Sequence, residues 1–272
     1  MRKYYLGFIF LFAYCTTMNA QTIVGSMINL EQERSRISLV DEFMKRFNGI
    51  EDRPDITPNI KDYEEKRYLV LFNGKMFKSF EDSTFIAAKD FVKRVRKDSV
   101  MLHYSDTAWF AKATCHGTLK NKEVSFVLYL TVEARTSDMF KWVINRAEGK
   151  IFNLTPSAFS DKVMIGPDSH ETKFMNLQHI TSGKDDYISY YMSKKHRIDP
   201  TTAFLTLIYN GQLNIDYVED LEFFFYQVPD YVFSIKEFNR NDSKNDGWLI
   251  NSFKRITEQE KKKEMMFIYN NK

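Results

Sequence analysis

Two adjacent stretches of the chain, residues 107–119 and 123–133, alternate apolar with polar or small side chains at a period of two. Successive side chains of a strand point to opposite faces of a sheet, so this alternation predicts β-strands. Residues 100–104 form a further apolar run, and polar turns at 105–106 and 120–122 separate the three stretches. The pattern therefore predicts three consecutive antiparallel strands.

The apolar sides of the last two strands coincide if Lys120 pairs with Glu123. The middle strand then contributes mostly small residues, and the last strand contributes larger ones: Trp109, Ala111, Ala113, Cys115 and Gly117 face Val124, Phe126, Leu128, Leu130 and Val132. Small side chains leave room for a helix to pack on the sheet. A helix predicted over residues 82–97, with a capping box at Ser79 and Asp82, carries such an apolar stripe: Phe85, Ala88, Val92 and Val95. We expect this stripe to occupy the space.

The same two periods predict the remaining elements. Helices are expected over residues 33–47, 171–180 and 186–195, and a further helix should begin at Asp199-Pro200 and end at Asn210-Gly211. Strands are expected over residues 68–72, 141–154, 216–228, 231–239 and 248–256. Helices followed by antiparallel strands, twice along the chain, indicate an α+β fold in which helices pack on curved antiparallel sheets.

The first twenty residues have the composition of a secretory signal peptide. Arg2 and Lys3 precede an uncharged, mostly apolar run at residues 4–14, and Ala20 supplies the small residue before a cut at Gln21. Cys15 follows the bulky Tyr14, whereas a lipoprotein signal needs small residues there, so a lipid anchor is less favoured than release. We predict a secreted or periplasmic protein with three parts: a leader at 1–20 and helix-on-sheet modules at 21–160 and 161–272.

Removal of this leader leaves Cys115 as the one cysteine, so no intrachain disulfide is possible and stability has to come from burial. It also removes Arg2 and Lys3 from 39 basic residues, which leaves 37 against 36 acidic ones. This near-neutral balance gives no electrostatic basis for binding nucleic acid. No later apolar stretch approaches the roughly 20 residues of a transmembrane helix, so we expect a chain that does not span a membrane.

The order of the elements resembles the NTF2-like superfamily, a cystatin-like α+β cone of helices packed on a bent antiparallel sheet. Residues 43–49, 85–95 and 100–145 carry the resemblance in one copy, and residues 204–211 with the strand 248–251 carry it in a second. Residues 142–145 (Trp-Val-Ile-Asn) and 248–251 (Trp-Leu-Ile-Asn) are nearly identical four-residue sequences. Either a duplication or a chance match explains this similarity. The resemblance implies two NTF2-like modules in tandem. It does not imply one function, because this fold hosts enzymes, ligand binders and dimerisation modules. The chain is also similar to secreted bacterial proteins of unknown role with the same Asn-Ala-Gln processing site.

No set of residues in the sequence predicts a reaction, a cofactor or a metal. Adjacent strand residues face opposite sides, so His116 is not placed to activate the thiol of Cys115, which we expect to be a buried space-filling residue. The five histidines lack the spacing of a zinc site: His103, His116, His170, His179 and His196. The polar loop at 239–247 lacks the glycine and glutamate positions of a calcium loop. We therefore predict no catalytic residue, no metal and no cofactor.

Two groups of residues are candidates for binding. His103, Asp106, Trp109 and Tyr129 would line the pocket of a cone, and Phe224 with Tyr226, in the aromatic run 223–226, would form a partner surface unless protein covers both faces of that strand. The first hypothesis is a non-catalytic ligand-binding or assembly module that takes a small molecule, a carbohydrate or a protein, including a second copy as a homodimer. The alternative is an enzyme with an acid/base pair in the cone-shaped pocket.

Export is directly testable. When the full chain is produced in a bacterial host, we expect the mature protein to begin at Gln21, because Ala20 offers the small residue that signal cleavage requires. N-terminal sequencing and intact mass of the extracytoplasmic fraction measure this. Recovery of the chain from the cytoplasm with residues 1–20 still attached would contradict it.

Overall fold

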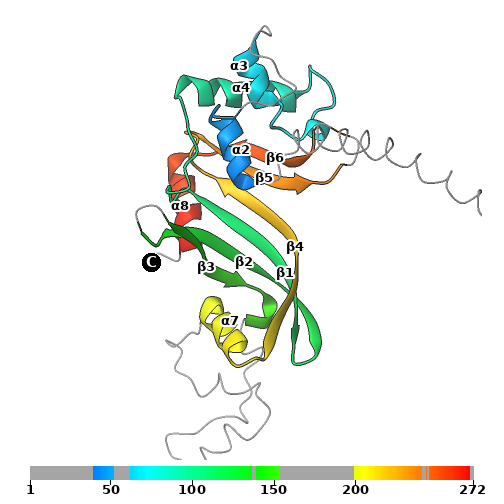
Figure 1. Cartoon of the computed structure of the whole chain (residues 1–272), viewed down its shortest axis with the longest axis vertical. Helices are drawn as coiled ribbons and strands as arrows, with labels where there is room; N and C mark the ends of the chain where they lie inside the picture. The colour runs from blue at the N-terminus through cyan, green and yellow to red at the C-terminus, as the bar shows by residue number, and fades with distance from the viewer. Residues whose placement is uncertain are drawn as a thin grey trace, which may run out of the picture. The chain divides into compact units, whose positions relative to one another are not determined.

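The computed structural model describes residues 39–51, 62–136, 139–152, 199–240, 243 and 245–269. These residues have an α+β fold and form two compact units (Figure 1). Unit 1 draws its described residues from Met1–Asp106 and Phe225–Glu258, and unit 2 draws them from Thr107–Phe224 and Gln259–Lys272. The leader and the helices predicted at 171–180 and 186–195 lie outside the described residues. The consecutive modules 21–160 and 161–272 stay a prediction, since their boundary lies within residues 153–198, which are not described.

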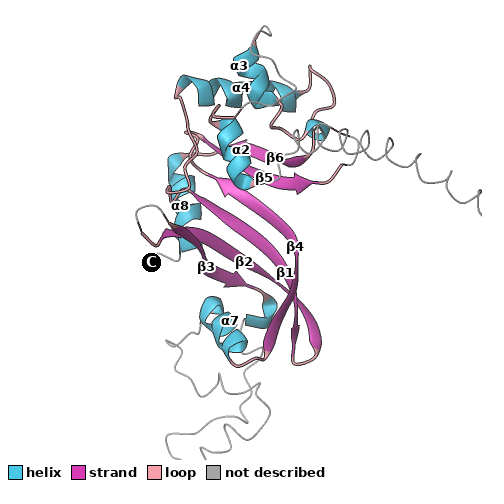
Figure 2. Ribbon diagram, viewed as in Figure 1, coloured by secondary structure: helices cyan, strands magenta, loops and turns pink. Residues whose placement is uncertain are grey.

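Unit 1 packs helices on a two-stranded hairpin (Figure 2). Its elements are α2 (Val40–Phe47), α3 (Tyr63–Leu69), the 3-10 turn η1 (Gly74–Met76), α4 (Ser83–Lys97), β5 (Tyr231–Phe238) and β6 (Gly247–Arg255). β5 and β6 pair antiparallel, with Phe233 opposite Phe253. The ring of Phe233 lies 5.7 Å from that of Phe47 in α2 and 5.6 Å from that of Phe91 in α4. Aromatic contacts therefore join both helices to the hairpin.

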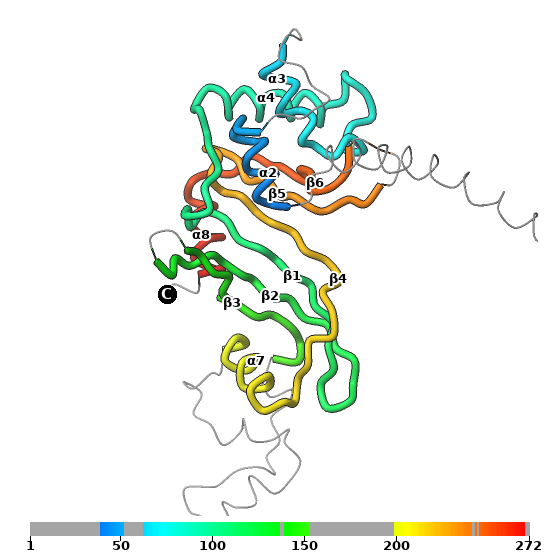
Figure 3. Tube along the Cα trace, viewed as in Figure 1, coloured from blue at the N-terminus to red at the C-terminus, as the bar shows by residue number. Residues whose placement is uncertain are grey.

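Unit 2 is built on strands in the order β3-β2-β1-β4. Its elements are β1 (Trp109–Leu119), β2 (Lys122–Ala134), β3 (Phe140–Glu148), the 3-10 turn η2 (Lys150–Phe152), α7 (Pro200–Tyr209), β4 (Leu213–Phe225) and α8 (Glu258–Tyr269); the last residue of β4 and the first of α8 are assigned to unit 1. β1, β2 and β3 form an antiparallel meander that the trace in Figure 3 follows. A bulge between Tyr129 and Leu130 interrupts the pairing of β2 with β3.

The apolar faces of β1 and β2 coincide, as predicted. The observed register places Thr118 opposite Glu123, two residues away from the predicted pairing of Lys120 with Glu123. A shift of two residues preserves the side-chain alternation, so every residue keeps its face. Ala113 therefore lies opposite Leu128 and Cys115 opposite Phe126, and all four are buried.

The helix that covers this face is α7, so the prediction that the Phe85 stripe would occupy it is wrong. Ala203 and Phe204 of α7 belong to the same buried cluster as Cys115 and Phe126. The helix that carries Phe85, α4, instead packs on β5 of unit 1. The two helices both present an apolar stripe, and periodicity alone does not say which sheet face each one meets.

The ends of α7 follow the sequence signals. Asp199 caps the helix, because its Oδ1 accepts hydrogen bonds from the backbone N–H groups of Thr201 and Thr202 at 2.9 and 3.0 Å. These bonds, with that of the Thr202 hydroxyl as the largest contribution, lower the pKa of Asp199. Gly211 ends the helix with a φ of 65°. The start of α4 differs from the prediction, since Asp82 rather than Ser79 is the cap and accepts from Thr84 N at 2.9 Å.

Two short predicted strands are absent from the described structure. Tyr68 belongs to α3, and only Phe72 of the stretch 68–72 forms a bridge, to Ile250. Residues 100–104 contain no strand. Apolar runs of about five residues fit a buried helix end or a buried loop as well as a strand, which is why periodicity failed here. The strand predicted over 141–154 ends at Glu148, and η2 follows it.

Gly117 allows β1 and β4 to approach closely. A Cβ at this position would lie 2.2 Å from the backbone oxygen of Asn214 and 3.2 Å from Cε1 of Phe126. The backbone oxygen belongs to a strand and is not free to move away as the end of a flexible side chain would. Glycine is therefore a packing requirement at position 117.

We expect Gly117→Ala to lower the free energy of unfolding by about 1–3 kcal/mol, because the new methyl group forces β4 away from β1. The denaturant midpoint followed by circular dichroism measures the loss. Ser125→Ala, at an exposed position of β2, is the matched control and should change the free energy by less than about 0.5 kcal/mol. Equal midpoints for the wild type and Gly117→Ala would contradict the close approach.

Candidate functional site

A group of aromatic rings lies at one end of the sheet face that α7 covers at its other end. Trp142 of β3 meets Trp109 of β1 edge to face, with centroids 5.0 Å apart and planes at 72°. The ring of Phe223 in β4 lies 5.8 Å from that of Trp142 and 6.2 Å from that of Trp109. Trp109 is 1% exposed, whereas Trp142 is 43% exposed. Trp142 is thus held by buried rings and still presents much of its surface to solvent.

Trp142 is the centre of an apolar row along β3. Phe140 is 41% exposed and Ile144 is 37% exposed, and both share the face of Trp142 because the three alternate along the strand. Met139, just before the strand, is 53% exposed. We call Phe140, Trp142 and Ile144 the β3 row.

The backbone N–H and C=O groups of the β3 row point away from β2. Arg135 N donates to Met139 O at 2.7 Å, which makes these two residues a hydrogen-bonded pair of the β2–β3 hairpin. Pairs alternate in an antiparallel ladder, so Phe140, Trp142 and Ile144 fall in the non-hydrogen-bonded pairs and direct their N–H and C=O groups to the outer side. β3 is the terminal strand of the order β3-β2-β1-β4. Within the described sheet, the outer edge of β3 therefore has backbone N–H and C=O groups that pair with no other strand. The same residues carry exposed apolar side chains.

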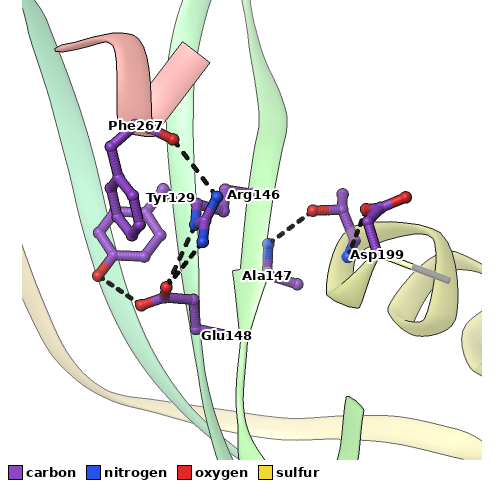
Figure 4. Close-up of polar contacts among 7 residues, drawn as sticks. Tyr129, Arg146, Ala147, Glu148, Asp199 and Phe267 are labelled. Atoms are coloured by element: carbon purple, nitrogen blue, oxygen red, sulfur yellow. Dashed lines mark hydrogen bonds and ion pairs between the residues drawn. The ribbon is translucent and has the colours of Figure 1, made fainter. Parts of the chain in front are cut away.

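The far end of this edge is already used. Ala147 N donates to the side-chain oxygen of Thr201 in α7 at 3.2 Å. This bond, drawn in Figure 4 beside the cap that Asp199 provides, attaches α7 to β3. The accessible stretch of the edge consequently ends before Ala147.

The opposite face of unit 2 carries a polar cluster that holds α8 (Figure 4). Glu148 accepts from the Tyr129 hydroxyl at 3.0 Å and from Nε and Nη2 of Arg146 at 3.2 and 3.1 Å. The guanidinium of Arg146 lies 3.7 Å from the ring centroid of Phe267 in α8, and its Nη1 donates to Phe267 O at 3.5 Å. Burial first, and the charge of Glu148 second, raise the pKa of Tyr129 to about 12. The phenol is therefore neutral at physiological pH and acts as a hydrogen-bond donor within this cluster.

The predicted pocket residues occupy different places. Trp109 and Tyr129 lie on opposite faces of the unit 2 sheet, because Tyr129 pairs with Lys112 and Trp109 shares the face of Ala111. Tyr129 accordingly contacts Phe110 and Phe267, whereas Trp109 contacts Trp142. His103 and Asp106 belong to unit 1, where both are exposed and Asp106 N donates to His103 O at 3.2 Å. Binding by these four residues stays a prediction.

The aromatic run of β4 alternates between the two faces of the sheet. Phe223 lies with Trp109, whereas Phe224 stacks on Phe110 at 5.1 Å with planes 15° apart. Tyr226, in unit 1, is 7% exposed. The rings of Phe224 and Tyr226 thus take part in packing. The exposed aromatic side chains of unit 2 lie on β3 (Phe140 and Trp142), β4 (Tyr217), α7 (Tyr209) and α8 (Phe267).

Cys115 and His116 face opposite sides of β1, as their adjacency predicts. Cys115 is 1% exposed, and burial raises the pKa of its thiol. His116 stacks on Tyr217 at 4.9 Å, and its Nε2 lies 2.8 Å from Oε2 of Glu219. The prediction of a buried, space-filling cysteine is confirmed, and the pair has no nucleophile–base geometry.

Within the described residues, no group of three or more histidine, cysteine, aspartate or glutamate side chains is arranged to hold a metal ion. Of the polar loop at 239–247, Asn245 accepts from Gly74 N at 2.8 Å and from Nη1 of Arg240 at 2.9 Å. Its side chain therefore holds η1 against the β5–β6 hairpin. Among the helices that the structure describes, none has the length and apolarity needed to cross a bilayer.

The β3 row was missed by sequence reasoning. Phe140, Trp142 and Ile144 stand at every second position, but Val143 between them is apolar too, so the alternation is incomplete. Residues 142–145 were noted only as one of two similar four-residue sequences. In the other sequence, Trp248, Leu249 and Ile250 are buried, with Trp248 only 7% exposed. Alternation shows which side chains share a face, but the strand order decides whether another strand or a helix covers that face.

No family model, no curated protein and no solved structure matches this chain. The geometry of the described residues is accordingly the basis for the function proposed below.

The Tyr129–Glu148 bond predicts a pH-dependent stability. Tyr129→Phe should lower the free energy of unfolding at pH 8 by about 1 kcal/mol, because one hydrogen bond to a carboxylate is lost. The phenol of the unfolded chain ionises near pH 10, whereas folded Tyr129 stays neutral up to about pH 12. Its contribution is therefore complete below about pH 10 and is lost between about pH 10 and 12. Urea midpoints at pH 8 and pH 11 should show the difference between wild type and Tyr129→Phe shrinking, and a constant difference would refute the assignment.

Proposed function

We propose that this chain is an exported, non-catalytic assembly module that binds another polypeptide along the outer edge of β3. The observation that carries the proposal is the β3 row, in which exposed apolar side chains and outward backbone groups belong to the same three residues. Export through cleavage of the leader and a tandem NTF2-like organisation are parts of the same proposal, since dimerisation modules are among the functions of that fold.

The length of α7 supports an uncovered surface at this end of the sheet. α7 has 10 residues, so it extends about 15 Å. β3 has 9 residues and extends about 30 Å. A helix of that length covers only part of the strand, and its contacts are with the Ala147 end. Of the described helices that pack on this face, α7 does not reach the Trp142 end.

The backbone geometry favours a polypeptide over a small molecule or a carbohydrate. Aromatic rings alone would suit any of the three ligand classes. An extended peptide, however, is the ligand that pairs with a row of outward N–H and C=O groups and places alternate side chains against the β3 row. The rings are also pre-positioned, because Trp109 and Phe223 hold Trp142 in place, and this lowers the entropy cost of binding.

Site-specific photo-crosslinking tests the proposal. The photoreactive amino acid benzoylphenylalanine replaces Trp142 in the full chain, produced in the cells from which the sequence comes. Because Trp142 lies at the centre of the binding edge, we expect a discrete ultraviolet-dependent adduct whose mass increase is that of a polypeptide. The same replacement at Lys122, an exposed residue at the start of β2, is the matched control and should give no adduct. Equal labelling at both positions, or no adduct at position 142, would refute a polypeptide-binding edge.

A further inference from the structure

We infer that the polypeptide bound at β3 is a second copy of this chain, paired antiparallel so that Trp142 lies opposite Trp142 of the other copy. The inference rests on the proposed function, because it names the occupant of the same edge. It predicts a two-fold symmetric dimer with the symmetry axis perpendicular to the sheet at Trp142.

The outward backbone groups determine the register. When two copies of one strand pair antiparallel about such an axis, the same face of each copy lies on the same side of the joined sheet. A residue whose N–H and C=O groups point outward must therefore pair with another such residue. Phe140, Trp142 and Ile144 are the residues of β3 before the bulge whose N–H and C=O groups point outward. Only the register centred on Trp142 pairs all three, with Phe140 opposite Ile144 on either side. Each copy then satisfies its outward groups with the same groups of the other.

The two ends of the accessible part of β3 agree with a register centred on Trp142. The backbone N–H of Ala147 is bound to Thr201 of α7, which excludes the far end of β3 from pairing. Phe140 is the first residue of the strand. The segment available for a partner strand is therefore residues 140–146, and the β3 row occupies the regular part of it before the bulge.

The side chains are self-complementary in this register. On one face Phe140, Trp142 and Ile144 meet only each other, so an apolar row is covered by an apolar row. On the other face Lys141 falls opposite Val143, and its ammonium lies 3.5 Å from a carboxylate oxygen of Glu133 in its own chain. No like charges face each other directly across the axis. The near balance of 37 basic and 36 acidic residues after leader removal also leaves little net-charge repulsion between copies.

An unrelated partner would explain these features less completely. It would need an apolar row of its own and a matching sequence of backbone groups, whereas a second copy brings both by symmetry. An edge strand of this kind that was left unpaired would invite uncontrolled aggregation, and natural proteins usually protect such edges with charges or proline. Lys141 is the one charged residue before the bulge, and it lies on the face opposite the β3 row.

The oligomeric state of the mature protein is the first test. Light scattering over micromolar concentrations should give the mass of a dimer. Phe140→Lys should raise the dimer dissociation constant by at least about tenfold, because charge in an edge row opposes strand pairing. Tyr209→Lys is the matched control, since Tyr209 is 91% exposed on α7 and lies outside the edge, and it should leave the dissociation constant unchanged. The circular dichroism spectrum of each variant should match that of the wild type, which checks that the fold is retained.

Disulfide trapping tests the register. A mixture of Phe140→Cys and Ile144→Cys chains should form a mixed disulfide on mild oxidation, because positions 140 and 144 face each other across the axis. Each variant alone should remain uncrosslinked, since two copies of position 140 are four residues apart along the strands, roughly 13 Å. Cys115 is buried and does not compete. Equal crosslinking in the single-variant samples would overturn the Trp142-centred register.

The outcomes separate the two proposals. A monomeric mass, together with an adduct at position 142 that contains a different polypeptide, would overturn the inference that the partner is a second copy. It would leave the proposed function standing. A monomeric mass without any adduct would overturn both. A dimer that Phe140→Lys leaves intact would place the interface elsewhere and overturn the inference.

Discussion

Contacts between aromatic rings are the interaction on which both units depend. In unit 1 the ring of Phe233 lies against those of Phe43, Phe47, Phe91 and Phe225. In unit 2 Phe126, Phe152 and Phe204 contact one another with centroids between 5.6 and 5.9 Å apart. Cys115 is free and buried, so burial of apolar area stabilises the described structure without a described disulfide. Rings suit this task because each removes a large apolar area from water while ordering only two side-chain torsions.

Such packing also explains why the sheet of unit 2 has an exposed apolar row on β3. Ala113 of β1 is small and lies in the buried cluster that α7 joins. Gly117 of β1 lets β4 approach β1 closely. A ten-residue helix covers less than the length of the strands beneath it. Beyond its reach the sheet ends in Trp109, which is buried under its neighbours, and Trp142, which is half exposed. The exposed row thus arises from the mismatch between a short helix and long strands, together with the terminal position of β3.

Strands with clear alternation and helices with strong end signals could be predicted from the sequence. The coincident apolar faces of β1 and β2 and the start of α7 at Asp199 are examples. Short apolar runs could not be assigned, as the helical Tyr68 shows, because helix and strand patterns are indistinguishable over about five residues. The candidate site was predicted only in part. Trp109 does belong to the aromatic group, but its partner Trp142 was seen as a repeat element, and Tyr129 lies on the other face.

The sequence by itself determined the local structure: which residues share a face, where the capped helix begins, and that Cys115 and His116 point in opposite directions. These properties follow from backbone geometry, which relates neighbours along the chain. The tertiary structure alone decided which helix covers which sheet face and which strand lies at the edge. Those properties depend on contacts between residues far apart in sequence, such as Phe204 with Phe126 and Thr201 with Ala147. The exposure of Trp142 is a consequence of such contacts, which is why no local pattern could reveal it.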